Sequence, residues 1–382
     1  MKRTVLWLAA FLTALSLQTF AVFAAAAPTL LKAKQEAESK GYTFITSFDE
    51  IVSLAKKEGR LRVLSAEDPN VIKATAEAFQ KKYPFINVRA EGIEGTEVYL
   101  RVLSEMKAGF AKWDVNYLAP DYYPEYLPYQ KKFDVLGMAQ QGVLKIPPSL
   151  VDPYNRHIVA LQSNAQIVAY NKELISGEKV PANWEDFLKA EFKDRKFATD
   201  IRPKVLATLV PAWGIEKTLD FSKKLADQKP IWLRGDAQII TQLMMGQYQI
   251  AMGQNYKTFV RVQKKDVAGV LGLKIVEPLP VRLSETEGVL ATAENPNAAL
   301  LWLAFQAGLE GQKIRDDLDL AASIFSSGSK HEQLAKGKKV SPHRLGSLHQ
   351  NERVRRGYCE GSRLSSSGQK VDFLDSRLNS PS

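Results

Sequence analysis

Apolar and polar residues recur with two different periodicities along the first part of the chain. Apolar residues at every second position indicate strands, and apolar residues three or four positions apart indicate amphipathic helices. This pattern predicts strands at 61–63, 86–88 and 115–118 and helices at 72–79 and 98–106. Strands and helices that alternate with short connections are typical of a parallel sheet covered by helices.

A second block of the same kind follows a less regular segment, 121–153, that is rich in tyrosine and proline. Here the pattern predicts helices at 184–192, 205–213, 237–246 and 296–309 and strands at 197–199, 250–252 and near 289. Two extended apolar passages, 157–171 and 271–283, flank the middle of this block. The middle is therefore expected to form one lobe, and the first and last parts together the other.

The length of 382 residues also favours two domains, since one core rarely serves so long a chain. Apolar residues make up 45% and charged residues 25%, as in soluble globular proteins. We expect an α/β fold with lobe 1 at 45–160 plus 277–340 and lobe 2 at 161–276, joined by two crossing strands.

The first residues have the pattern of a secretory signal peptide, predicted over residues 1–26. Lys2 and Arg3 precede an apolar run that ends near Phe23 in a cluster of small residues suited to cleavage. A membrane anchor is the alternative, but polar residues dilute the run, and no later apolar stretch reaches the roughly 18 residues that a membrane span needs. We expect a soluble, exported protein of the periplasm.

The formal charge of +10 is spread unevenly. The two N-terminal cations and the segment from Ser341 onward carry half of it, and acids interleave with bases elsewhere. We therefore expect no nucleic-acid partner. The only cysteine, Cys359, cannot form a disulfide within the chain, so packing must hold the fold.

Four stretches carry a resemblance to a known family. They read KKEGRLRVLSAEDPNVIKATAEAFQKKYP, ALQSNAQIVAYNKE, MMGQYQIAMGQNYKTF and ATAENPNAALLWLAFQAGLEGQ, within residues 51–340. Together they resemble the periplasmic substrate-binding components of bacterial ABC importers, in the group that includes ferric-iron binders. The resemblance implies a type II-like fold whose two lobes close on a small solute in an interlobe cleft and deliver it to a membrane permease. We expect a monomer.

Candidate site residues in lobe 1 follow its first two strands. In open α/β sheets, ligands bind beyond the carboxyl ends of the strands, near helix N-termini. Ser65 follows the first strand, and Gly95 and Thr96 follow the second, where glycine lets a backbone approach a ligand closely. The alternative at the first strand is that Asp68 or Asn70 only caps the next helix.

Further candidates lie in lobe 2. Ser163 and Asn164 interrupt an apolar passage, and buried polar groups there need a partner in the protein or the solute. Asp200 and Arg202 follow a strand; the Arg202 guanidinium suits carboxylate or phosphate, or it pairs with Asp200. Asn255 follows the strand at 250–252.

Tyr256 is the last candidate, and it bears on ferric iron. Ferric binders of the resembling group usually show two adjacent tyrosines hereabouts, whereas Lys257 follows Tyr256 here. Tyr122, Tyr123 and Tyr126 lie in the irregular segment of lobe 1, where aromatic packing is expected. An anionic or polar organic solute therefore fits better than iron, which stays the alternative; we expect no resident metal or cofactor.

Two other protein classes receive less support from the sequence. Before Ser341 the chain has only His157 and His331, no cysteine, and no zinc or phosphate-binding motif. Ser327 and Lys330 formally make an S-x-x-K motif, but they lie in a loop far from any other motif of that kind. A secreted enzyme is thus a weak alternative. A DNA-binding regulator is weaker still, because no helix-turn-helix segment precedes the lobes.

The apolar pattern collapses in the last segment, 341–382. One interpretation is a basic disordered tail. The other is out-of-frame translation, since suitable codons for this segment, when read one base later, encode apolar residues at helical spacing. In both interpretations the segment is aberrant and stands outside the lobes.

Overall fold

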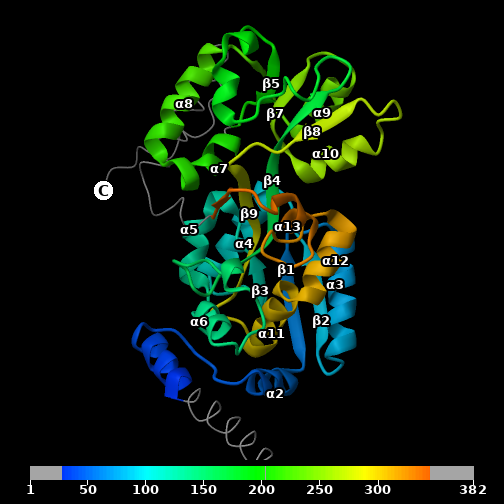
Figure 1. Cartoon of the computed structure of the whole chain (residues 1–382). Coiled ribbons are helices and arrows are strands. Elements are labelled where there is room, and N and C mark those ends of the chain that lie inside the picture. The colour runs from blue at the N-terminus through cyan, green and yellow to red at the C-terminus, as the bar shows by residue number, and fades with distance from the viewer. Residues whose placement is uncertain (1–27, 203, 345–382) are drawn as a thin grey trace, which may run out of the picture. The chain divides into compact units, whose positions relative to one another are not determined.

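The computed structural model describes residues 28–202 and 204–344, apart from the side chains of Thr96 and Asp121. The predicted signal peptide and the segment after Arg344 lie outside the described residues. The chain divides into two compact units (Figure 1). Unit 1 comprises Met1–Val159 and Thr286–Gly311, and unit 2 comprises Ala160–Glu285 and Gln312–Ser382.

Unit 1 contains a small sheet in the order β2-β1-β3-β9. Its elements are α2 (Phe48–Glu58), β1 (Arg60–Ser65), α3 (Pro69–Lys82), β2 (Asn87–Gly92), α4 (Thr96–Lys107), β3 (Val115–Tyr117), α5 (Tyr123–Tyr126), α6 (Val135–Gln140) and α11 (Pro296–Ala307), with the end of β9 (Leu279–Val289). The predicted strand-helix-strand-helix-strand order is confirmed. β1 runs parallel to β2 and β3, but β9 runs antiparallel to β3, so the sheet is mixed rather than wholly parallel.

Helix α3 shows why the first predicted helix forms where it does. Asp68 caps its start by accepting a hydrogen bond from the Asn70 N–H at 2.9 Å, and Pro69 occupies its first turn. Phe79 on its buried face packs edge-on against Trp302 and Phe305 of α11. This contact joins an early and a late segment of the chain in one core.

The irregular segment after β3 folds into short helical turns, as its composition predicts. Tyr123 and Tyr126 are fully buried. Tyr126 donates to the Tyr99 carbonyl at 2.8 Å, and the Tyr123 hydroxyl contacts Asp152 at 3.3 Å. Burial raises the pKa of both phenols well above 10. The expected packing role is confirmed for these two tyrosines.

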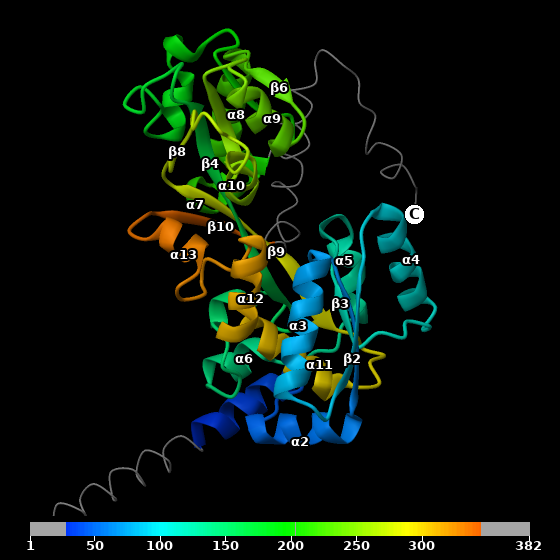
Figure 2. The same ribbon diagram turned by 90° about the vertical axis from the view of Figure 1, so that its right-hand side faces the viewer.

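Unit 2 is built on a sheet in the order β9-β4-β7-β5-β6, with β8 on β4 and β10 on β9 (Figures 1 and 2). Its strands are β4 (Val159–Asn171), β5 (Phe197–Asp200), β6 (Ile231–Leu233), β7 (Ile250–Asn255), β8 (Leu271–Lys274) and β10 (Val340–His343). Its helices are α7 (Lys204–Trp213), α8 (Ile215–Asp227), α9 (Asp236–Met244), α10 (Tyr256–Gln263), most of α12 (Leu309–Asp319) and α13 (Lys330–Ala335). β7, β5 and β6 are parallel, whereas β4 is antiparallel to β7 and β8.

Successive residues of the parallel strands pack on opposite faces of this sheet. Phe197 and Met252 belong to one apolar cluster with α7 and α8, and Ala198 and Ala251 belong to another with α9 and α10. Helices thus cover both faces of the sheet, and the loops at the carboxyl ends of its parallel strands form one edge. Asp200, Arg202, Asn255 and Tyr256 lie at or just beyond these strand ends.

One predicted helix of unit 2 is wrong. Residues 184–192 form two short 3-10 turns, η4 (Trp184–Leu188) and η5 (Ala190–Phe192), instead of one α-helix. Lys189 between them is extended, with ψ 150°. Trp184 is held by packing on Phe187 and by a 3.0 Å hydrogen bond from Nε1 to the Pro278 carbonyl. Tertiary anchoring here overrides the helical spacing of the apolar residues.

The units differ from the expected lobes in the segment 312–340, which groups with unit 2. Gln312 Nε2 donates to the Leu161 carbonyl at 3.0 Å, and Lys257 and Arg261 of α10 pair with Asp319 of α12. These contacts attach the segment to β4 and α10.

The start of the predicted aberrant tail is ordered. Residues 341–343 belong to β10, which pairs in parallel with β9. The Ser341 hydroxyl, fully buried, donates to the Thr208 carbonyl of α7 at 2.7 Å. The first three residues of the predicted tail therefore pair with the sheet of unit 2.

Within the described parts of the chain, no helix combines the length and the hydropathy that crossing a membrane requires.

Candidate functional site

Four charged side chains meet at the carboxyl ends of the parallel strands of unit 2. Asp200 ends β5, Arg202 and Lys204 follow it, and Asp236 opens α9 after β6. Arg202 donates from Nε and Nη2 to the two carboxylate oxygens of Asp200, at 3.0 and 2.7 Å. Lys204 Nζ lies 3.0 Å from Asp200 Oδ2 and 2.7 Å from Asp236 Oδ2. The two carboxylates and two cations neutralise one another, and we call these four residues the charged cluster.

Asp200 is the centre of the charged cluster. It is 5% exposed and also accepts hydrogen bonds from the backbone N–H groups of Arg202 and Gly235, at 2.9 and 3.2 Å. Burial alone would raise the pKa of the Asp200 carboxyl, but hydrogen bonds from Arg202 and the nearby Lys204 ammonium outweigh it and lower the pKa to about 2. Asp200 is therefore a permanent anion that fixes the Arg202 guanidinium in one position.

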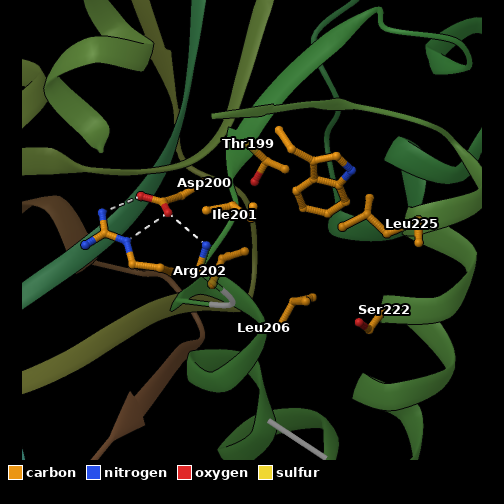
Figure 3. A pocket seen from close by; sticks show the side chains of 10 residues that line it. Thr199, Asp200, Ile201, Arg202, Leu206, Ser222 and Leu225 are labelled. Carbon is orange, nitrogen blue, oxygen red and sulfur yellow. Dashed lines mark hydrogen bonds and ion pairs between the residues drawn. The ribbon is translucent and has the colours of Figure 1, made fainter. Parts of the chain in front are cut away.

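A pocket lies beside the Asp200–Arg202 pair (Figure 3). Residues from the end of β5, the first turn of α7, helix α8 and β6 line it: Thr199, Asp200, Ile201, Arg202, Val205, Leu206, Ser222, Leu225, Ala226 and Trp232. In Figure 3 the Arg202 guanidinium turns away from Leu206 and Leu225. The pocket thus has an ionic rim on one side and an apolar wall on the other.

A second polar group links the charged cluster to the long strands. Asn164 of β4 donates from Nδ2 to Ser284 Oγ of β9 at 2.7 Å and accepts from Asn255 Nδ2 at 3.0 Å. The other amide atom of Asn255, Oδ1, caps α10 by accepting from the Thr258 N–H at 3.2 Å, and its backbone N–H lies 3.4 Å from Asp236 Oδ1. We call Asn164, Asn255 and Ser284 the amide bridge.

Ser163 does not face this group. It is fully buried, and its Oγ accepts a hydrogen bond from the Ile324 N–H at 2.8 Å. Its required partner is thus found within the protein, in the loop after α12.

Tyr256 opens α10 and packs edge-on against His331 of α13, with ring centroids 5.7 Å apart. Burial raises the pKa of its phenol, with a smaller contribution from Asp316. Ferric iron binds the deprotonated phenolate. A neutral phenol that packs against another ring is therefore poorly suited to bind it.

The candidates of unit 1 lie at the carboxyl edge of its own sheet. Ser65 ends β1 beside Gly92, its register partner at the end of β2, and its Oγ accepts from the Glu67 N–H at 3.4 Å. Gly95 precedes α4 with φ 94°, a conformation that favours glycine, and Thr96 begins that helix. The structure therefore brings Ser65 and the Gly95–Thr96 turn to one edge, while the capping role of Asp68 is also present.

Sequence reasoning missed Lys204, Asp236 and Ser284. Lys204 and Asp236 each lie within four residues of the end of a strand, β5 and β6 respectively. Their positions after strand ends could have been recognised from the sequence if β6 had been predicted. Ser284 has no such signal, because its role depends on Asn164, which is 120 positions away. Within residues 28–344 as described, no three histidine, cysteine, aspartate or glutamate side chains are grouped to hold a metal ion.

Structural comparison gives the fold. The chain is similar to a Trichodesmium protein, IdiA (FutA), in complex with iron and citrate (17% identity, TM-score 0.63, covering 80% of this chain and 98% of that one). It is similar to the Mannheimia haemolytica ferric iron-binding protein A in an open conformation (18%, 0.61, 80% and 97%). It also resembles the Atu4243-GABA receptor (15%, 0.59, 82% and 100%). These likenesses confirm the two-lobed α/β fold of periplasmic binding proteins.

Comparison with curated protein sequences gives no match. The family model described as "Bacterial extracellular solute-binding protein", in contrast, matches residues 126–341, more than half of the chain. The matched range holds the charged cluster, the amide bridge and the whole parallel sheet of unit 2. The chain therefore belongs to the bacterial extracellular solute-binding protein family.

Proposed function

We propose that this protein captures a small anionic or polar solute in the periplasm and delivers it to the membrane permease of an ABC importer. Family membership supports solute binding, and the fold that the chain shares with the substrate binding protein of an ABC transporter from Agrobacterium tumefaciens supports delivery. In this proposal the solute is released unchanged, so the protein performs no chemistry.

The charged cluster is the observation that carries the proposal. Its side chains extend from the strand ends of a rigid, doubly covered sheet, where ligands of open α/β folds bind. The amide bridge adds donors and acceptors at the same edge. Ser65, Gly95 and Thr96 are proposed as the contribution of unit 1.

Solute capture is tested by native mass spectrometry of the exported protein, followed by calorimetric titration of each small molecule that co-purifies. We expect one acid or polar metabolite with a dissociation constant of about 1 µM or tighter, which corresponds to roughly 8 kcal/mol. The solute should be recovered unchanged after incubation. Conversion of the molecule to a product would contradict the proposal and favour an enzyme.

Delivery is tested separately in cells. Deletion of the gene should abolish high-affinity uptake of the identified solute, and a plasmid copy should restore it. Unchanged uptake in the deletion strain would refute the importer role while leaving solute binding intact.

Ferric iron is the second candidate, because similar folds include the IdiA and ferric iron-binding proteins named above. Three features of this chain argue against it: Lys257 follows Tyr256 where a second tyrosine is usual, Lys257 is paired with Asp319, and the Tyr256 phenol is packed. Titration with ferric citrate, followed by visible absorption, distinguishes the candidates. A phenolate–iron band that disappears in Tyr256→Phe would establish the iron binder.

A further inference from the structure

Arg282 is a partly buried cation with no partner among the residues that the structure describes. It lies in β9, and among residues 28–202 and 204–344 no hydrogen bond, ion pair or ring contact reaches its side chain. Other partly buried cations of unit 2 do have partners: Lys204 contacts two carboxylates, Lys257 contacts Asp319, and Lys274 donates to the Gly177 and Val180 carbonyls. Arg344 lies over the Phe325 ring. Arg282 therefore stands out by its chemistry as well as its position.

Strand alternation places Arg282 on the polar face of β9. Leu279, Val281 and Leu283 belong to an apolar cluster on one face of the strand. Arg282 and Ser284 alternate with them and so face the other way. Ser284 is a member of the amide bridge, which leads through Asn255 to Asp236 and the charged cluster.

Helix α7 lies on this same face. Ser341 of β10 is paired in register with Pro280 and donates to the Thr208 carbonyl of α7. Pro280 and Arg282 are two positions apart and share a face, so Arg282 projects toward the region that α7 and the amide bridge border.

The carboxylates of the charged cluster are already engaged. Asp200 accepts from Arg202, Lys204 and Gly235, and Asp236 is bound to Lys204. A charge removed from water without a counter-ion destabilises the fold, and buried charges in proteins are paired for that reason. Among residues 28–202 and 204–344 no carboxylate pairs with Arg282, so a bound solute can supply its counter-ion.

We propose that Arg282 binds the oxyanion group, a carboxylate or phosphate, of the solute. This inference rests on the proposed function and adds to it a binding residue and a solute class. The planar guanidinium of arginine matches both oxyanions through two parallel hydrogen bonds. Arg202 keeps its pairing with Asp200 and acts as a wall of the site, because releasing it would leave a buried carboxylate poorly compensated.

The test measures binding of named anions to the full exported protein and to three variants. Citrate, succinate and inorganic phosphate are titrated calorimetrically, and putrescine serves as a probe that lacks an oxyanion. Arg282→Met keeps an unbranched apolar side chain but removes the charge. Arg282→Lys keeps the charge but loses the planar guanidinium that donates two parallel hydrogen bonds. Lys264→Gln is the matched control, since Lys264 is exposed at the end of α10 and forms no ion pair among the described residues.

We expect the tightest anion to bind Arg282→Met at least ~10-fold more weakly than wild type, because charge-assisted hydrogen bonds are lost. Arg282→Lys should lie between the two, and Lys264→Gln should bind as wild type does. Wild-type affinity in Arg282→Met would overturn the inference but leave the proposed function standing. If no anion binds wild-type protein while putrescine or ferric citrate does, the anionic solute class and this inference both fail.

A stability measurement separates binding from a structural role. Without solute, Arg282→Met should melt at the same temperature as wild type or about 1–2 °C higher, because a cation without a partner is removed from a partly dry site. A lower melting temperature together with weaker binding would mean that Arg282 supports the fold, and would overturn the inference.

Discussion

Replacing Asp200 with asparagine removes the charge at the centre of the charged cluster while keeping the side-chain shape. The pKa of the Asp200 carboxyl lies at about 2 instead of its ordinary 3.8. Each pH unit of such a difference is worth about 1.4 kcal/mol, so the ionised carboxylate stabilises the folded state by roughly 2 kcal/mol at neutral pH. Asp200→Asn should lose about that amount.

The lowered pKa also predicts in which direction the stability difference changes with pH. Because the folded pKa is lowered, the stabilisation is complete above the ordinary pKa and is lost as pH falls toward 2. The gap between wild type and Asp200→Asn should therefore be about 2 kcal/mol at pH 7 and below about 1 kcal/mol at pH 2.5. Urea unfolding at both pH values measures it.

The control is Asp220→Asn, which breaks an exposed pair with Lys224 on α8. It should change the unfolding free energy by less than about 0.5 kcal/mol at either pH. If Asp200→Asn were as stable as wild type at pH 7, or if its deficit persisted at pH 2.5, the assignment of Asp200 as a stabilising anion would be refuted.

Three further outcomes are expected. Ser163→Ala leaves the buried Ile324 N–H without an acceptor and should cost about 1–3 kcal/mol in urea unfolding with no change in solute affinity; a loss of affinity alone would restore Ser163 to the site. Burial lowers the pKa of His331 from 6.5 to about 4, so the folded state should lose roughly 3 kcal/mol between pH 6.5 and 4; His331→Gln should flatten that slope, and a slope that persists would contradict this. Phe197→Ala opens a cavity in the core beside α7 and should lower the free energy of unfolding by about 3–5 kcal/mol. A melting temperature lowered by less than about 2 °C would show instead that neighbouring side chains fill the cavity.

The regular part of the fold could be predicted because local pattern and tertiary structure agree there. β1 begins with alternating polar and apolar residues, and β7 begins with a continuous apolar run, as a strand covered on both faces should. Helix α3 has a cap, an apolar face and basic residues in its last turn. The segment 184–192 failed because Trp184 is fixed by Pro278, far along the chain. Helices such as α8 were missed even though their pattern is amphipathic.

The candidate site could be predicted only as a set of positions. Residue type and strand ends identified Asp200, Arg202 and Asn255. The sequence left open whether Arg202 pairs with Asp200, and the two hydrogen bonds from the guanidinium to the carboxylate answer that question. Partners such as Ile324 for Ser163 are more than 150 positions away and carry no local signal. The role proposed for Arg282 could not be predicted from the sequence either, because it follows from the lack of an interaction partner among the described residues.

The attachment of residues 312–343 to unit 2 means that this unit is completed only after the chain has been synthesised beyond residue 312. Ser163, Thr208 and Lys257 precede their partners Ile324, Ser341 and Asp319 in the chain. A nascent chain that ends before residue 312 therefore lacks these three contacts, and unit 2 reaches its final packing only when the segment that supplies them has left the ribosome.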